Sequence, residues 1–260
     1  MTHRPLILVV NDDGIHAPGL KILAETLRVY GDVVTVAPHV ERSASAHAIT
    51  ITQPLRAEKL GPDTWAIEGS PVDCVMVAFW KLLTRKPDWV CSGINRGGNL
   101  GIDTLYSGTV GAALEAALHG VPALAVSCQG ERPLRYEAAA KVVTLIMDKS
   151  DQWRKELGHR VLNINVPSGE AKDLKGIRFA TLGRRLYDQN LVEGVDPRGR
   201  PYFWIGGGGE SHADIADSDC IHFDEGYATL SVLHPSLFDE RSNLALKDSF
   251  SQQLNSTFRT

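Results

Sequence analysis

The sequence of 260 residues has no hydrophobic stretch long enough to cross a lipid bilayer, which takes roughly 18 apolar residues. Its N-terminal apolar run is short and leads directly into acidic residues, so we expect no secretory leader. Long basic stretches are also missing, and 27 Lys and Arg against 31 Asp and Glu give a formal net charge of -4. That balance argues against nucleic acid as the main partner. We expect a cytoplasmic protein that binds neither membranes nor nucleic acids.

The chain also has few cysteines, and their spacing argues against both a disulfide framework and a zinc site. Cys74, Cys91, Cys128 and Cys220 are far apart, and three of them lie in apolar segments. Neither a disulfide framework nor a zinc site has this spacing, so we expect buried thiols. The chain has no internal repeat, and it is long enough to bury a substantial core.

The first strand predicted from the sequence ends in two adjacent carboxylates. Residues 6–10 are all apolar and rich in β-branched side chains, which is typical of a strand buried on both faces. Asp12 and Asp13 follow in a polar turn closed by Gly14, at the end of the strand where α/β sheets bind ligands. Adjacent carboxylates repel one another unless a cation lies between them, so the pair predicts a site for a hard divalent cation. A polar turn that only caps the next helix is the alternative.

The loop after the second strand offers further ligands. Residues 33–37 predict that strand, parallel to the first because a helix over 20–27 connects them. The loop at 38–47 is rich in serine and alanine, and Arg42 supplies a cation suited to phosphate. A serine hydroxyl there can also ligate a hard metal. The alternative is a solvent-exposed loop whose serines bond to their own backbone.

Three further features carry less functional weight. His16, beside the start of the first helix, is a secondary candidate for proton transfer. Residues 48–52 alternate like a half-exposed strand, which we expect to pair with 65–67. Ser70 predicts the N-cap of a helix and is a weak candidate for an anion contact.

A second stretch with candidate functional residues runs from residue 88 to residue 120. A strand at 89–91 opens into a loop at 92–101 that holds four glycines and two asparagines, of which Asn95 offers a neutral oxygen ligand. Ser107, Gly108 and Thr109 then begin a helix of small residues. The exposed N–H groups and hydroxyls at such a helix start suit a phosphate. A capped helix after a flexible loop is the alternative.

The pattern of predicted strands and helices changes near residue 170. Up to that point strands and helices alternate, which predicts a three-layer α/β fold with a mostly parallel sheet over residues 1–170. Residues 171–260 predict a β-rich extension and a polar tail that join subunits, because isolated apolar strands need a partner. Its expected strands lie at 176–181, 201–205 and 226–233, and four glycines occupy 206–209.

Five motifs occur in the N-terminal half, in a fixed order. They are Asn11–Gly19, Arg42–Ser45, Gly69–Val75, Ser92–Gly101 and Tyr106–Ala116. In order and spacing they resemble the motifs of the stationary-phase survival protein SurE family. Two departures stand out, since relatives usually carry glycine at the position of Ala44 and a different sequence at 38–41. The resemblance is weaker in the C-terminal half.

The resemblance implies a fold and a set of ligands. It implies a Rossmann-like, metal-dependent phosphatase that acts on nucleoside monophosphates, with one divalent ion, Mg²⁺ or Mn²⁺, in each subunit. The implied metal ligands are Asp12, Asp13, Ser43 and Asn95. The implied phosphate contacts are Asn99, Ser107, Gly108 and Thr109. It also implies that subunits exchange hairpins and tails in a homodimer or homotetramer.

The expected reaction is hydrolysis of a phosphomonoester, with Asp12 and Asp13 as the catalytic residues. Nucleoside 5′-monophosphates are the expected substrates, with 3′-monophosphates and short polyphosphate left open. We favour water positioned by an aspartate as the nucleophile, since an aspartyl-phosphate would need one carboxylate free of the metal. A nucleotide-binding sensor without turnover is the alternative. An oxidoreductase is disfavoured, because the first strand does not lead into a Gly-x-Gly-x-x-Gly turn.

Overall fold

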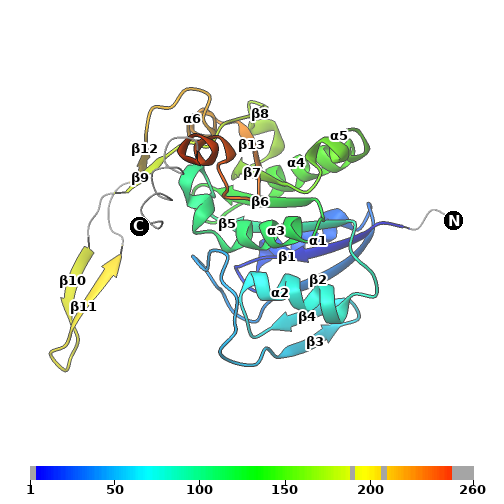
Figure 1. Cartoon of the computed structure of the whole chain (residues 1–260), viewed down its shortest axis with the longest axis horizontal. Helices are drawn as coiled ribbons and strands as arrows, with labels where there is room; N and C mark the ends of the chain where they lie inside the picture. Colours follow the sequence, from blue (N-terminus) through cyan, green and yellow to red (C-terminus); the bar gives the residue numbers. More distant parts are fainter. Residues whose placement is uncertain (1–3, 188–190, 206–209, 248–260) are drawn as a thin grey trace, which may run out of the picture.

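A nine-stranded sheet organises the fold (Figure 1). The structure is a computed structural model that describes residues 4–187, 191–205 and 210–247. In spatial order the strands are β3 (Ala57–Gly61), β4 (Thr64–Ile67), β2 (Asp32–Pro38), β1 (Leu6–Val10), β5 (Trp89–Arg96), β6 (Ala123–Gln129), β7 (Val161–Pro167), β13 (Ala228–Leu233) and β8 (Ile177–Phe179). The strands from β4 to β7 are all parallel, whereas β3 and β13 are antiparallel to their inner neighbours. The predicted mostly parallel sheet is confirmed.

Helices cover both faces of this sheet. One face carries α1 (Pro18–Leu27), α4 (Glu137–Met147) and α5 (Ser150–Leu157), and the other carries α2 (Pro71–Val77) and α3 (Gly108–Leu118). The side chains of β1 alternate between them, with Ile7 and Val9 in the first core and Leu8 and Val10 in the second. Every residue of β1 is buried, as expected for a central strand between two helical layers.

The expected strand at 48–52 does not form. Residues 48–56 are irregular, and β4 pairs instead with β3, at 57–61. The reason is that the start of α2 takes the polar groups that a strand would need. Thr50 donates its N–H and its hydroxyl to the carboxylate of Asp73, at 2.9 and 2.6 Å, and the hydroxyl of Ser70 donates to the carbonyl of Ala48.

The C-terminal third divides between the main sheet and two small ribbons. β13 and β8 extend the main sheet, whereas β9 (Arg185–Tyr187) pairs with β12 (Glu210–His212), and β10 (Leu191–Val195) pairs with β11 (Pro201–Ile205). The β10–β11 hairpin stands away from the sheet (Figure 1). The glycine run at 206–209 lies outside the described residues.

Short helical segments complete the chain. They are the π-helical turn η1 (Ala78–Leu82), the 3₁₀ turns η2 (Gly101–Leu105) and η3 (Ala171–Asp173), and α6 (Asp219–Asp224). All four cysteines are buried and unpaired, as predicted, and burial raises the pKa of their thiols. Among the helices that are described, none combines the length and the apolar character needed to span a bilayer.

Candidate functional site

The candidate site lies at the carboxyl edge of the sheet, where β2, β1 and β5 are neighbours. Because these strands are parallel, the loops that follow them emerge at the same edge. The loop at 11–14 follows β1, the loop at 39–47 follows β2, and the loop at 97–100 follows β5. Hydrogen bonds join Asp12 to the 39–47 loop and to the start of α3, and join Asp13 to the end of β5.

Asp12 is buried and is held by the first turn of α3. The N–H of Thr109 donates to Asp12 Oδ2 at 3.1 Å, and the Thr109 hydroxyl donates to Oδ1. Burial raises the pKa of Asp12 from 3.8 to about 6, against the opposing effect of the bond from Thr109. The carbonyl of Asp12 accepts the N–H of Arg42 at 2.7 Å, which ties the 39–47 loop to the end of β1.

Asp13 faces a cation that the sequence analysis did not single out. The N–H of Arg96 donates to Asp13 Oδ2 at 2.8 Å, and Arg96 Nε lies 3.8 Å from Oδ1. Burial raises the pKa of Asp13, and Arg96 opposes that effect. The guanidinium of Arg96 also donates to Glu41 at 2.8 Å, and Glu41 accepts the hydroxyl of Ser43 at 2.7 Å. The position of Arg96, directly after Asn95 at a strand end, was the signal for it.

Asn95 is oriented by its own loop. A register shift in the β5–β6 pairing falls between Ser92 and Asn95, and Asn95 Nδ2 donates to the carbonyl of Gly97 at 2.9 Å. Within the described part of the chain, no hydrogen bond uses Asn95 Oδ1. This oxygen is therefore available to a cation.

The oxygen atoms around the two aspartates fit a hard divalent cation. Two carboxylates are adjacent, and Asn11 Oδ1, Ser45 Oγ and Ser92 Oγ are buried without a hydrogen-bond partner. The described residues contain no cluster of three or more His, Cys, Asp or Glu, so further ligands from their side chains would be amide or hydroxyl oxygens. Asn95 and Ser43 supply both kinds, although the Ser43 hydroxyl bonds to Glu41 in this structure.

The first turn of α3 lies directly against Asp12. Ser107 is its N-cap, and its hydroxyl oxygen accepts the N–H of Val110 at 3.1 Å. A Cβ on Gly108 would lie 2.9 Å from Asp12 Cβ and 2.4 Å from Ser45 Oγ, so only glycine fits there. The structure thus brings Ser107, Gly108 and Thr109 to the acidic pair.

Asn99 is buried, and three neighbours from β6 and β7 hold it. Its Nδ2 donates to Ser127 Oγ and its N–H to Asn165 Oδ1, both at 2.7 Å. Its carbonyl accepts the side-chain amides of Asn163 and Asn165, at 2.9 and 3.1 Å. These partners were not predicted from the sequence, although two asparagines within the apolar run at 161–167 are a usable signal.

Two secondary candidates play no visible part in the site. His16 is exposed, and no hydrogen bond among the described residues connects it with Asp12 or Asp13. Ser70 is a structural N-cap, since its oxygen accepts the N–H of Asp73 at 3.0 Å while Asp73 accepts the N–H of Ser70 at 2.7 Å.

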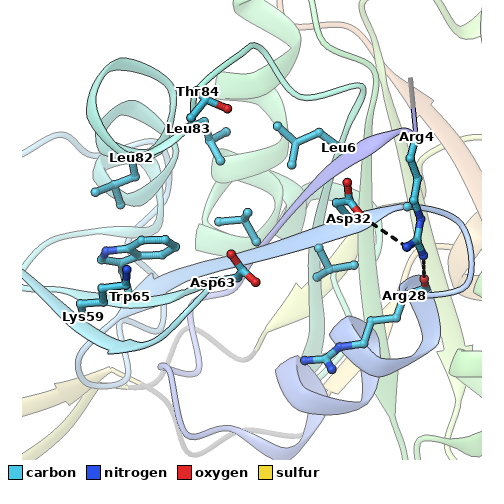
Figure 2. Close-up of a pocket in the computed structure, with 13 residues that line it drawn as sticks. Arg4, Leu6, Arg28, Asp32, Lys59, Asp63, Trp65, Leu82, Leu83 and Thr84 are labelled. Atoms are coloured by element: carbon cyan, nitrogen blue, oxygen red, sulfur yellow. Dashed lines mark hydrogen bonds and ion pairs between the residues drawn. The ribbon is translucent and has the colours of Figure 1, made fainter. Parts of the chain in front are cut away.

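A hollow of about 720 Å³ lies at the opposite edge, near the starts of β1 and β2 (Figure 2). Three of its five charged side chains contact a partner. Arg4 contacts Asp32 at 3.3 Å and donates to the carbonyl of Arg28, and Lys59 lies over the ring of Trp65. Of its two carboxylates, that of Asp32 is paired with Arg4, so the hollow lacks a pair of free carboxylates and the carboxyl edge remains the candidate site.

The fold and the site define a Rossmann-like α/β protein with an oxygen-rich acidic pair beside a helix N-terminus. A family profile described as "Survival protein SurE" matches residues 7–189. The "5'-nucleotidase SurE" of Syntrophotalea carbinolica is 47% identical over 91% of this chain and 94% of its own length, and that of Geotalea uraniireducens is 45% identical over 93% and 97%. The crystal structure of the SurE protein from Aquifex aeolicus, 34% identical, covers 94% of this chain and 98% of its own with a TM-score of 0.81. The chain belongs to the SurE family.

Proposed function

We propose that this chain is a divalent-metal-dependent 5′-nucleotidase, which hydrolyses nucleoside 5′-monophosphates to nucleoside and phosphate. The observation that carries the proposal is the contact between Asp12 and Thr109, because it joins the acidic pair to a helix N-terminus. Relatives named as 5'-nucleotidases, similar over nearly their whole length, support it. 3′-Monophosphates and short polyphosphate carry the same phosphoryl group and are included as further substrates.

Asp12, Asp13, Ser43 and Asn95 would hold one Mg²⁺ or Mn²⁺. When bound, this ion polarises a phosphoryl oxygen and lowers the pKa of a bound water. Asp12 and Asp13 are the proposed catalytic residues, and one of them orients the attacking water. Ser43 must turn its hydroxyl away from Glu41 to act as a ligand.

The phosphate would lie at the start of α3. Ser107 supplies a hydroxyl group there, and Gly108 lets the backbone approach closely. Thr109 must turn its hydroxyl away from Asp12 to act as a second donor. Asn99 uses one side-chain N–H for Ser127, which leaves the second N–H of its amide for an oxygen of the phosphate.

Release of inorganic phosphate tests this proposal directly. We expect the metal-free chain to gain activity on AMP when Mg²⁺ or Mn²⁺ is added, and to lose it on chelation. A panel of 5′- and 3′-monophosphates and short polyphosphate ranks the substrates. Binding of AMP without any phosphate release would instead identify a nucleotide sensor.

The assembly and the location are part of the proposal. We propose a homodimer or homotetramer held together by residues 171–260, because the β10–β11 hairpin exposes most of its apolar side chains. Four buried cysteines without a disulfide suit the reducing cytoplasm.

A further inference from the structure

We propose that Glu115 is a positioning residue, which acts through His47 to fasten the 39–47 loop onto α3. The inference rests on the proposed function, since it concerns how Ser43 is aligned with Asp12 and Asp13. Glu115 touches none of the proposed ligands. Its carboxylate lies two turns into the helix whose first turn carries the phosphate donors.

The loop lies along one face of α3. A Cβ on Gly108 would be 2.4 Å from Ser45 Oγ, and one on Gly111 would be 2.3 Å from the carbonyl oxygen of Ala46. The N–H of Ala46 also donates to the carbonyl of Tyr106 at 3.0 Å. Successive loop residues therefore meet successive turns of the helix, at positions spaced like the contacts of one helix face.

The third contact in this series is an interaction between side chains. His47 Nε2 lies 2.8 Å from Glu115 Oε2, and His119 Nε2 lies 3.0 Å from Oε1. Glu115 is buried, and the bond with His47 is the main cause that lowers its pKa. Of the two histidines, only His47 belongs to the loop. His119 is in the C-cap of α3 and packs edge-on against the rings of Phe79 and Trp80.

The loop needs such an anchor because its own conformation is unfavourable. Residues 39–44 are exposed and form neither helix nor strand. Ala44 and Ala46 have φ angles of +56° and +50°, in the left-handed region that side chains disfavour. Freed from α3, this segment would leave that conformation, and Ser43 would lose its place beside the acidic pair.

The test compares the two histidines that share Glu115. Mn²⁺ binding is measured by calorimetry without substrate, amide hydrogen exchange is followed at 41–47, and phosphate release is measured separately. We expect His47→Ala to weaken Mn²⁺ binding about tenfold, because the variant loses one hydrogen bond to a charged group. Amide exchange in the loop should become faster. His47→Gln, whose amide can donate to the same carboxylate, should restore both to within about threefold. His119→Ala should change neither.

Two results would overturn the proposal. One is wild-type Mn²⁺ affinity and loop exchange in His47→Ala. The other is equal damage from His119→Ala, which would mean that Glu115 only stabilises the helix. Absence of phosphate release from the unaltered chain would instead count against the proposed function. The exchange measurement needs neither turnover nor metal, so it still decides whether His47 holds the loop.

Discussion

At the scale of single residues, substitution of Asp13 tests the proposed metal site. An Asp13→Asn side chain can still accept the N–H of Arg96, so the loop contact survives while the charge is removed. We expect Mn²⁺ affinity to fall more than about a hundredfold and phosphate release to be lost. The unfolding midpoint should stay near that of the unaltered chain, because one of two repelling charges has gone. Normal turnover in this variant, or full activity after exhaustive chelation, would refute the assignment.

The raised pKa of Asp12 predicts that the stability of the protein without added metal depends on pH. Its pKa rises from 3.8 to about 6 through burial, so between these values the folded state binds more protons than the unfolded state. The free energy of unfolding should therefore fall as pH rises from about 4 to about 6, by about 3 kcal/mol at most, and then level off. Denaturant titrations of the chelated protein measure this slope.

The matched variant is Asp12→Asn, which has no carboxyl group to titrate. Its free energy of unfolding should lack the fall from about pH 4 to about pH 6. The variant also loses one acceptor for Thr109. Parallel curves for the two proteins would show that Asp12 is not the group responsible.

At the scale of elements, Gly111 tests the contact between α3 and the 39–47 loop. Alanine normally stabilises a helix interior relative to glycine by about 1 kcal/mol. Here the new Cβ would meet the carbonyl oxygen of Ala46 at 2.3 Å, so the backbone of the loop must shift. We expect Gly111→Ala to lower the unfolding midpoint and to reduce kcat/KM about tenfold or more. A variant that is more stable and fully active would show that the loop yields without consequence.

Elements that depend only on residues close together in the sequence could be predicted from the sequence. The apolar run of β1 and the capping box at Ser70 both depend on neighbouring residues, and both form as expected. The segment at 48–52 has a strand-like pattern, but its polar groups bond to Asp73, which lies far along the chain. β3 was missed because its residues are mostly polar and exposed.

The candidate site shows the same difference between local sequence patterns and contacts of residues far apart in the chain. Asp12 and Ser107–Thr109 were predicted from strand-end and helix-start patterns, although the bond between Asp12 and Thr109 joins residues far apart in sequence. Arg96 and Glu41 were missed, because their importance comes from contacts between separate loops. The strand-end position of Arg96 marks it as a candidate, but no local pattern shows which groups it contacts.

At the scale of the whole molecule, the β10–β11 hairpin tests the proposed assembly. Trp204 is 68% exposed and Ile205 is 92% exposed, and an isolated two-stranded ribbon is only marginally stable in water. Replacing both residues by serine should shift the native mass toward monomer in light scattering, while Mn²⁺ binding persists. Leu118→Ser, at a 59% exposed residue on α3, is the control. A full-length monomer at micromolar concentration, or an unchanged oligomer in the double variant, would contradict the assembly.

Truncation would be a poor substitute for that test. β13 spans Ala228–Leu233 and pairs with β7 inside the main sheet. Cutting the chain before Leu233 would therefore damage the main sheet as well as any interface, and a change in mass would have two causes.

The position of β13 also bears on how the chain is made. During synthesis β7 leaves the ribosome long before its antiparallel partner does, because the segment from residue 168 to residue 227 comes between them. Until β13 arrives, the nascent sheet ends in an apolar strand with a row of unpaired N–H and C=O groups, an arrangement that favours aggregation. A fragment that stops at residue 170 would keep that edge permanently open, and we expect it to depend on chaperones to remain in solution.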